Sequence, residues 1–195
     1  MPRPANPADS SEGAPVELAR RPVRSPPVSE RAQASIRLAT IADAGRIREI
    51  YNHEVLTSTA TFDLIPRTLG EQEAWIGERT GAFAAIVAIG EGGEVLGFGA
   101  LSPYKERAAY RTSVEDSVYV DRSCHGRGVG KLIVTELVGV AQLSGFHTMF
   151  ARIEAGGAAS RALHASCGFE LVGTEREVGR KFHRWLDVAI MQKLL

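Results

Sequence analysis

The sequence is short of cysteine, of net charge and of long apolar runs, and each shortage excludes a class of protein. Its 195 residues include two cysteines, Cys124 and Cys167, which suit neither a disulfide framework nor a zinc site. Basic and acidic residues number 23 each, and this balance argues against a nucleic-acid partner. The longest apolar run, residues 82–89, is far below the roughly 20 residues that span a bilayer. We therefore expect a cytoplasmic protein with no metal, no nucleic acid and no membrane partner.

Residues 1–34 differ in composition from the rest of the chain. They hold seven of the nine prolines, mix charges of both signs and show no helical or alternating apolar period. Such a segment buries too little apolar surface to offset its ordering entropy, and it lacks the apolar stretch of a secretory signal. We predict a disordered proline-rich extension over 1–34 and a single domain over 35–195.

Beyond the extension, segments with strand and helix periods follow one another. Strands are predicted at residues 36–39, 84–89, 95–101, 113–120, 148–153, 169–172 and 186–194. Helices are predicted to start at the capping box 40–43 and to occupy residues 69–79, 128–143 and 160–166. Glycines between 84–89 and 95–101 indicate a hairpin. The pattern predicts an α/β (α+β) fold with a mixed central sheet of about six to seven strands flanked by helices.

A glycine-rich turn lies between the strand 113–120 and the long helix that follows. It reads Cys124-His125-Gly126-Arg127-Gly128-Val129-Gly130-Lys131. Free backbone N–H groups and the positive end of the helix dipole converge at such a turn, which suits phosphate. The alternating glycines fit the dinucleotide fingerprint poorly, and Leu132 after Lys131 departs from the nucleoside triphosphate loop. An ordinary tight turn remains the alternative.

The turn and the strand before it resemble the acetyl-CoA loop of the GNAT acetyltransferases. Gly128 and Gly130 match that loop, and His125 stands where glutamine or arginine is usual. Further segments extend the resemblance, which is greatest to phosphinothricin and methionine sulfoximine N-acetyltransferases: Tyr51 to His53, Thr57 to Phe62, Tyr104 to Tyr110, Glu115 to Val120 and Lys181 to Val188. The resemblance implies a homodimer, a splayed cofactor strand, acetyl-CoA as co-substrate and a small amine substrate. It also implies a role in herbicide resistance.

Cofactor-binding residues follow from the same resemblance. In the strand they are Val118, Tyr119 and Val120, whose backbone would pair with the pantetheine arm like an added strand. In the turn they are His125, Gly126, Arg127, Gly128, Val129, Gly130 and Lys131. Relatives commonly carry asparagine at the position of Gly157, so Gly157 and Ser160 complete the expected set. The backbone N–H of Val120 is the expected oxyanion donor.

Acylation of an amine needs a group that removes a proton from an ammonium and one that stabilises the oxyanion. By resemblance Glu115 is the general base, with a solvated edge-strand glutamate as the alternative. Asp116 points to the opposite face of a regular strand and is the weaker candidate. His164 is a general acid or second base, or else a histidine satisfied by nearby backbone. Cys167, beside Gly168, fits packing better than a nucleophilic role, so we expect direct transfer.

Substrate residues are predicted on the loop before the catalytic strand. Lys105, Arg107 and Tyr110 match the segment that faces the acidic group of phosphinothricin-like substrates, and arginine suits forked recognition of a carboxylate or phosphinate. The alternative is a solvated loop. Phe62 and Trp185 are expected as walls of the pocket or as core.

Three further functions stay open at this point. Acetylation of another amine, such as a protein N-terminus, is possible within the superfamily. A non-catalytic acetyl-CoA-binding regulatory module would bind the cofactor without turnover. A nicotinamide-dependent oxidoreductase would bind NAD in place of CoA.

Overall fold

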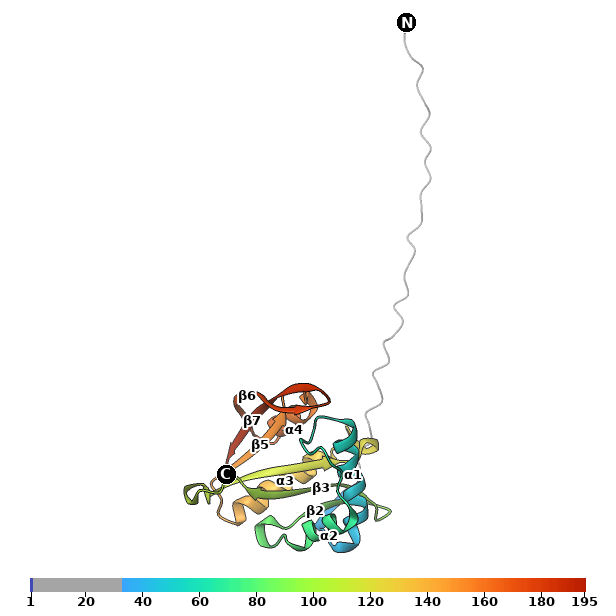
Figure 1. Ribbon diagram of the computed structural model, residues 1–195, viewed down its shortest axis with the longest axis vertical. Coiled ribbons are helices and arrows are strands. Elements are labelled where there is room, and N and C mark those ends of the chain that lie inside the picture. The colour runs from blue at the N-terminus through green and yellow to red at the C-terminus, as the bar shows by residue number, and fades with distance from the viewer. Residues whose placement is uncertain (2–32) are drawn as a thin grey trace.

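The computed structural model describes Met1 and residues 33–195, so the predicted extension lies almost wholly outside the described residues. In the described part, seven strands form one mixed sheet in the order β1-β2-β3-β4-β5-β7-β6 (Figure 1). The strands are β1 (Ala34–Leu38), β2 (Ile86–Gly90), β3 (Val95–Pro103), β4 (Ser113–Val120), β5 (Thr148–Glu154), β6 (Glu170–Lys181) and β7 (Arg184–Leu194). The predicted fold class is confirmed.

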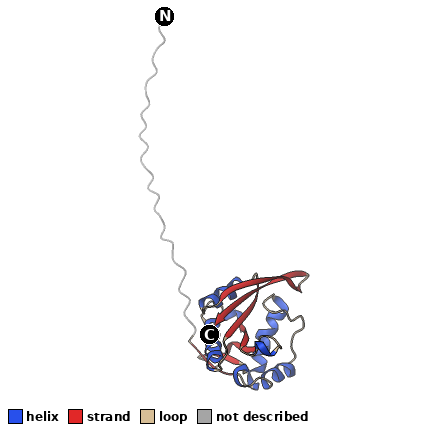
Figure 2. Ribbon diagram, turned by 90° about the vertical axis from the view of Figure 1, so that its left-hand side faces the viewer, coloured by secondary structure: helices blue, strands red, loops and turns tan. Residues whose placement is uncertain are grey.

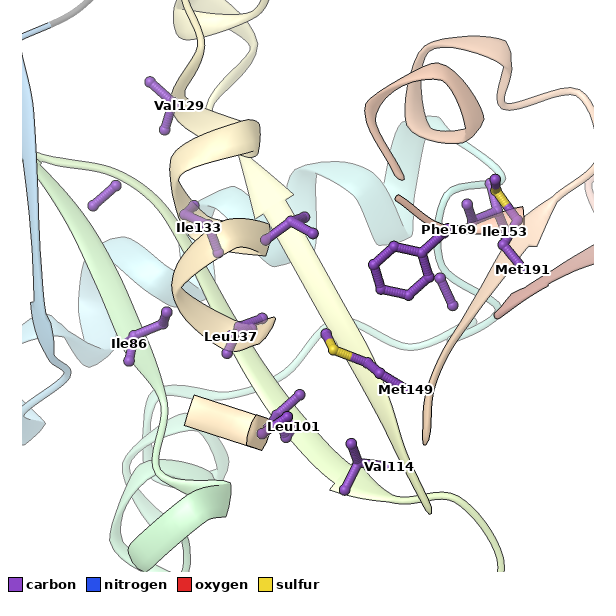
Figure 3. Close-up of a cluster of buried hydrophobic side chains, with 14 of the residues drawn as sticks. Ile86, Leu101, Val114, Val129, Ile133, Leu137, Met149, Ile153, Phe169 and Met191 are labelled. Carbon is purple, nitrogen blue, oxygen red and sulfur yellow. The ribbon is translucent and has the colours of Figure 1, made fainter. Parts of the chain in front are cut away.

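Helices cover both faces of this sheet (Figure 2). On one face α3 (Val129–Leu143) and α4 (Ala158–Ser166) pack over the larger core, where side chains of α3 point at the strands (Figure 3). On the other face α1 (Ala44–Thr57) and α2 (Leu69–Gly77) enclose a second cluster. No described helix is long and apolar enough to cross a membrane.

The first helix begins as the capping box predicts, after one short turn. Asp43 accepts hydrogen bonds from the backbone N–H of Thr40 at 2.8 Å and from its hydroxyl at 3.0 Å. A 3-10 turn over Ile41–Asp43 then leads into α1. The predicted apolar face of this helix is confirmed, because its members are buried: Ile47, Ile50, Tyr51 and Val55.

β4 and β5 run parallel but pair only at their beginnings. The register joins Ser113 to Thr148 and ends where Glu115 faces Phe150, whereas β3 pairs with β4 as far as Val120. Among the described strands, β4 therefore has no neighbour on its β5 side after Glu115. We call residues 116–120 of β4 and 151–154 of β5 the splayed ends, and they confirm the predicted splay of the cofactor strand.

Two glycines of β3 let α3 and β4 approach this strand closely. A Cβ at Gly99 would lie 2.6 Å from Cγ2 of Ile133 in α3. A Cβ at Gly97 would lie 2.8 Å from the carbonyl oxygen of Tyr119. Because backbone cannot move as readily as a side-chain end, Gly97 fixes the position of the end of β4.

The prediction for the last hairpin was wrong in extent. A strand was predicted at 169–172, but β6 continues to Lys181, and β7 begins at Arg184. The missed part is exposed and charged and contains Gly173 and Gly179, so it has no alternating apolar pattern. Its pairing with β7 holds it, with two register shifts along the way. Phe182 and His183 turn the hairpin with φ of 48° and 61°, without the glycine that usually marks such a turn.

Candidate active site

Glu115 is the last residue of β4 to pair with β5, so it stands where the two strands part. Its neighbours across the sheet are Ser102 of β3 and Phe150 of β5. Burial raises the pKa of this carboxyl, while the charge of Arg152 acts against the rise. A carboxylate with a raised pKa at this junction is suited to take a proton from an ammonium.

Asp116 points to the opposite face of β4, as the period of a strand predicts, and it meets His164 of α4 there. Its Oδ2 lies 2.9 Å from Nε2 of the imidazole, and both side chains are almost fully buried. The other ring nitrogen, Nδ1, lies 2.8 Å from the carbonyl oxygen of Ser160. Carboxylate and carbonyl oxygens both accept, so this arrangement favours the protonated imidazole, in which both ring nitrogens donate.

The electrostatics of the pair agree with this assignment. Burial acts to lower the pKa of His164, but the hydrogen bond and charge of Asp116 and the bond to Ser160 outweigh it, so the pKa is raised. With both nitrogens engaged, His164 can meet a substrate only by giving up one of these bonds. Its catalytic role therefore stays a prediction. The sequence analysis missed Asp116 as its partner, although the opposite face of the strand was the available signal.

The glycine-rich turn opens α3 in the way a phosphate site requires. Gly126 and Gly128 have φ of 73° and 87°, and Gly128 is the N-cap of the helix. A Cβ at either glycine would meet no protein atom within 4 Å, so space is open above this backbone. Arg127 and Lys131 are exposed beside it. The geometry can accept a pyrophosphate at the helix N-terminus.

His125 takes a structural part in the same turn. Its Nε2 lies 3.0 Å from the carbonyl oxygen of Val120, and because a carbonyl only accepts, Nε2 donates. The imidazole thereby ties the turn to the end of β4. Farther along, a Cβ at Gly130 would lie 2.9 Å from Leu163, so this glycine lets α4 approach α3.

Three of the four predicted substrate residues line one open cavity, and Phe62 does not. Lys105, Arg107 and Tyr110 line it together with Glu106, and its volume is about 490 Å³. Aromatic rings link its rim to the strand beside Glu115: Tyr104 stacks on Phe150 with centroids 4.0 Å apart. Phe150 is the residue that faces Glu115 across the register.

Phe62 and Trp185 lie apart from that cavity, near the last hairpin. The ring of Phe62 covers Gly179 of β6, where a Cβ would lie 2.1 Å from its Cε2. Trp185 is 61% exposed, so it is not core. Cys167 packs against the larger core cluster, as expected for a packing residue.

Comparisons with known proteins give one consistent result. The family model described as the acetyltransferase (GNAT) family matches residues 47–169. An L-methionine sulfoximine/L-methionine sulfone acetyltransferase of Pseudomonas aeruginosa is 40% identical over 160 residues, which cover 82% of this chain and 93% of the relative.

Two solved structures agree over the same region. One is a GNAT superfamily phosphinothricin acetyltransferase from Sinorhizobium meliloti in complex with acetyl-CoA, with a TM-score of 0.79, 40% identity and coverage of 83% of this chain and 88% of that chain. The other is a ribosomal-protein-alanine N-acetyltransferase from Brucella melitensis, with a TM-score of 0.80, 40% identity and coverage of 83% and 99%. With its splayed strand and its glycine turn, this chain belongs to the acetyltransferase (GNAT) family.

Proposed function

We propose that the protein is an acetyl-CoA-dependent N-acetyltransferase that acts on the amine of a small amino-acid-like substrate of the phosphinothricin or methionine sulfoximine type. The observation that carries the proposal is the placement of Glu115, half-buried and with a raised pKa, where β4 and β5 part. The names of the Pseudomonas and Sinorhizobium relatives support the substrate class.

Acetyl-CoA fits the residues present. The N–H groups at Gly126 to Gly130 would hold its pyrophosphate, with charge from Arg127 and Lys131, and the unpaired side of Val118 to Val120 would pair with the pantetheine arm. When bound, it supplies an acetyl thioester to the centre of the sheet. Gly157 is the N-cap of α4, and Ser160 lies in the first turn of this helix. Their backbone would line the other side of the pantetheine arm.

The protein's own part in the reaction is proton removal and orientation. Glu115 takes the proton from the substrate ammonium, and its raised pKa makes it a stronger base than an ordinary glutamate. The backbone N–H of Val120 faces the developing oxyanion. Transfer is direct, within a ternary complex and without a covalent acyl-enzyme: the C–N bond would form as the C–S bond of the thioester breaks, and CoA would leave as a thiolate that takes up a proton.

The amine substrate is held by its acidic end in this proposal. Arg107 and Lys105, on the cavity rim, bind its carboxylate or phosphinate, and Tyr110 closes one side. The aromatic contact from Tyr104 to Phe150 leads from this rim toward Glu115.

A second candidate is acetylation of a protein N-terminus. It is favoured by the name of the Brucella structure, which is as similar to this chain as the phosphinothricin acetyltransferase is. An open cavity also leaves room for a peptide. The two candidates differ in whether an acidic group on the acceptor is needed.

The experiment is CoA release from acetyl-CoA with phosphinothricin, methionine sulfoximine, methionine sulfone, plain amines and an alanine-ended peptide. Release with the acidic amino acids, lost in Glu115→Gln, supports the proposal, and release with the peptide alone supports the second candidate. Acetyl-CoA binding without release for any amine would identify a non-catalytic binding module.

We also propose a cytoplasmic homodimer. β6 is an edge strand of the sheet, and its outer part exposes Leu171, Val172 and Val178 by 58%, 54% and 51%. Apolar side chains on a long edge strand favour a protein contact. The two unpaired cysteines suit a reducing compartment. Light scattering coupled to gel filtration measures the oligomeric state, and a monomeric mass would contradict the dimer.

A further inference from the structure

A polar segment after α1 touches the neighbourhoods of both splayed ends. It comprises residues 58–62, which we call the tie segment. Ser58 and Thr59 are half-buried, and each donates its hydroxyl to a different glutamate. Glu54 lies in α1, beside the end of β4, and Glu154 is the last residue of β5.

The first contact leads to the turn after β4. Ser58 donates to Oε2 of Glu54, which is 8% exposed. Arg122, two residues beyond β4, binds the same carboxylate with its Nε at 2.9 Å and its Nη2 at 3.1 Å. Burial acts to raise the pKa of Glu54, but the hydrogen bonds from Arg122 and Ser58 outweigh it and lower the pKa. Glu54 is thus ionised and joins α1 to the start of the cofactor turn.

The second contact leads to the end of β5. The Thr59 hydroxyl lies 2.9 Å from Oε2 of Glu154, the last residue of that strand. Oε1 of the same carboxylate accepts the backbone N–H of Gly156 at 2.9 Å. Glu154 therefore holds both the tie segment and the turn that leads into α4.

We infer that the tie segment is a positioning element that fixes the separation of the splayed ends. It attaches through Ser58 to Glu54 of α1 and through Thr59 to Glu154 of β5. β4 and β5 have no direct pairing beyond Glu115, so these two contacts connect their ends across the space that the pantetheine arm would enter. Fixing that separation beforehand lowers the ordering cost of binding. The inference rests on the proposed function, because the bound ligand is acetyl-CoA.

The test measures the Kd for acetyl-CoA by calorimetry in full-length wild type, Thr59→Val, Glu54→Gln and the double variant. Valine keeps the shape of threonine and removes only the hydroxyl, so Kd is expected to rise roughly threefold to tenfold. If the segment acts only while both attachments are present, losing either one removes its whole effect. The Kd of the double variant is therefore expected to be no higher than the higher Kd of the two single variants.

Thr68→Val is the matched control. The Thr68 hydroxyl also donates to a glutamate, Glu71, at 2.8 Å, but at the start of α2. Thr68→Val is expected to lower Tm as Thr59→Val does and to leave the Kd for acetyl-CoA unchanged. The acid limb of the kcat/KM profile should stay in place in Thr59→Val, because Glu115 is untouched.

Several results overturn the inference. They are an unchanged Kd in Thr59→Val, an equal rise in the Thr68→Val control, or fold-changes that multiply in the double variant. In all three cases wild type still binds acetyl-CoA, so the proposed cofactor site stands and CoA release tests the activity separately. Wild type that does not bind acetyl-CoA overturns the proposed function and the inference together.

Discussion

At the scale of single residues, the charge near Glu115 sets the pH at which it can accept a proton. Its pKa is raised by burial, and Arg152 holds that rise back. Arg152 also pairs with Glu175 of β6. The activity of a base with a raised pKa falls as the pH drops through that value, so the acid limb reports on Glu115.

We predict that Arg152→Gln moves the acid limb of kcat/KM to higher pH. The change removes the positive charge that favours the ionised form of Glu115 and leaves Glu175 unpaired, which raises the pKa of Glu115 further. Rates measured across pH values in a constant-ionic-strength buffer check this. Arg180→Gln, on the exposed hairpin, is the control, and a limb that stays in place or moves to lower pH would contradict the assignment of Glu115.

The second prediction concerns the Asp116–His164 pair. Asp116→Asn removes the counter-charge of the buried His164, which then loses its proton, so the free energy of unfolding should fall by about 1–3 kcal/mol. His164 has a raised pKa in the folded protein, so its contribution is present below the unfolded pKa and is lost as the pH rises through the folded value.

Urea unfolding at several pH values measures the difference in the free energy of unfolding between wild type and Asp116→Asn. The gap between wild type and Asp116→Asn should be largest in mildly acidic solution and should narrow on the alkaline side. Asp187→Asn, which alters an exposed hydrogen bond to the backbone of Glu177, provides a comparison. A gap that widens with rising pH would show that the imidazole is neutral in the folded state.

At the scale of secondary-structure elements, the third prediction is that a glycine-to-alanine substitution changes stability in opposite directions in β3 and in α3. Gly97→Ala places a Cβ against the backbone of Tyr119 and should destabilise the fold by about 1–3 kcal/mol while weakening acetyl-CoA binding through β4. Gly139→Ala in α3 meets no atom within 4 Å and should stabilise the helix by about 1 kcal/mol. Thermal unfolding and calorimetry measure both. Equal effects of the two variants would contradict the close packing of β3 on β4.

Elements with a strong period were predictable from the sequence, and those held by partners were not. β4 was predicted with its observed bounds because Val114, Val118 and Val120 alternate with polar residues. The outer half of β6 was missed because its residues are mostly polar or glycine, and its hydrogen bonds to β7 leave no trace in the side-chain pattern.

The candidate site divides in the same way. The glycine turn was predicted from glycines between a strand and a helix, whereas Glu115 was predicted only through the family resemblance of its segment. Their roles stay predictions. The contacts of Ser58 and Thr59 were not found, since hydroxyls in a polar loop are ordinary and their partners lie up to 95 positions away. Such hydrogen bonds depend on the tertiary arrangement alone.

At the scale of the whole molecule, the fourth prediction is that a chain lacking residues 2–32 keeps its kcat/KM and Tm. β1 begins at Ala34, and the Pseudomonas relative is matched over 93% of its length by 82% of this chain. The acetyltransferase machinery that we propose therefore lies within residues 33–195. Initial rates and a thermal scan of the shortened chain check this, and a loss of rate at unchanged Tm would assign a functional role to the removed residues.

The short pairing of β4 with β5 has a consequence for the motions of the sheet. Three residue pairs join an antiparallel group, β1 to β4, to a second antiparallel group, β5 to β7. The side chains of the larger core cluster connect the two groups, and amide hydrogen exchange of residues 113–115 and 148–150 measures how readily this seam opens. The seam lies beside the proposed catalytic centre, so bound acetyl-CoA is expected to slow amide exchange there.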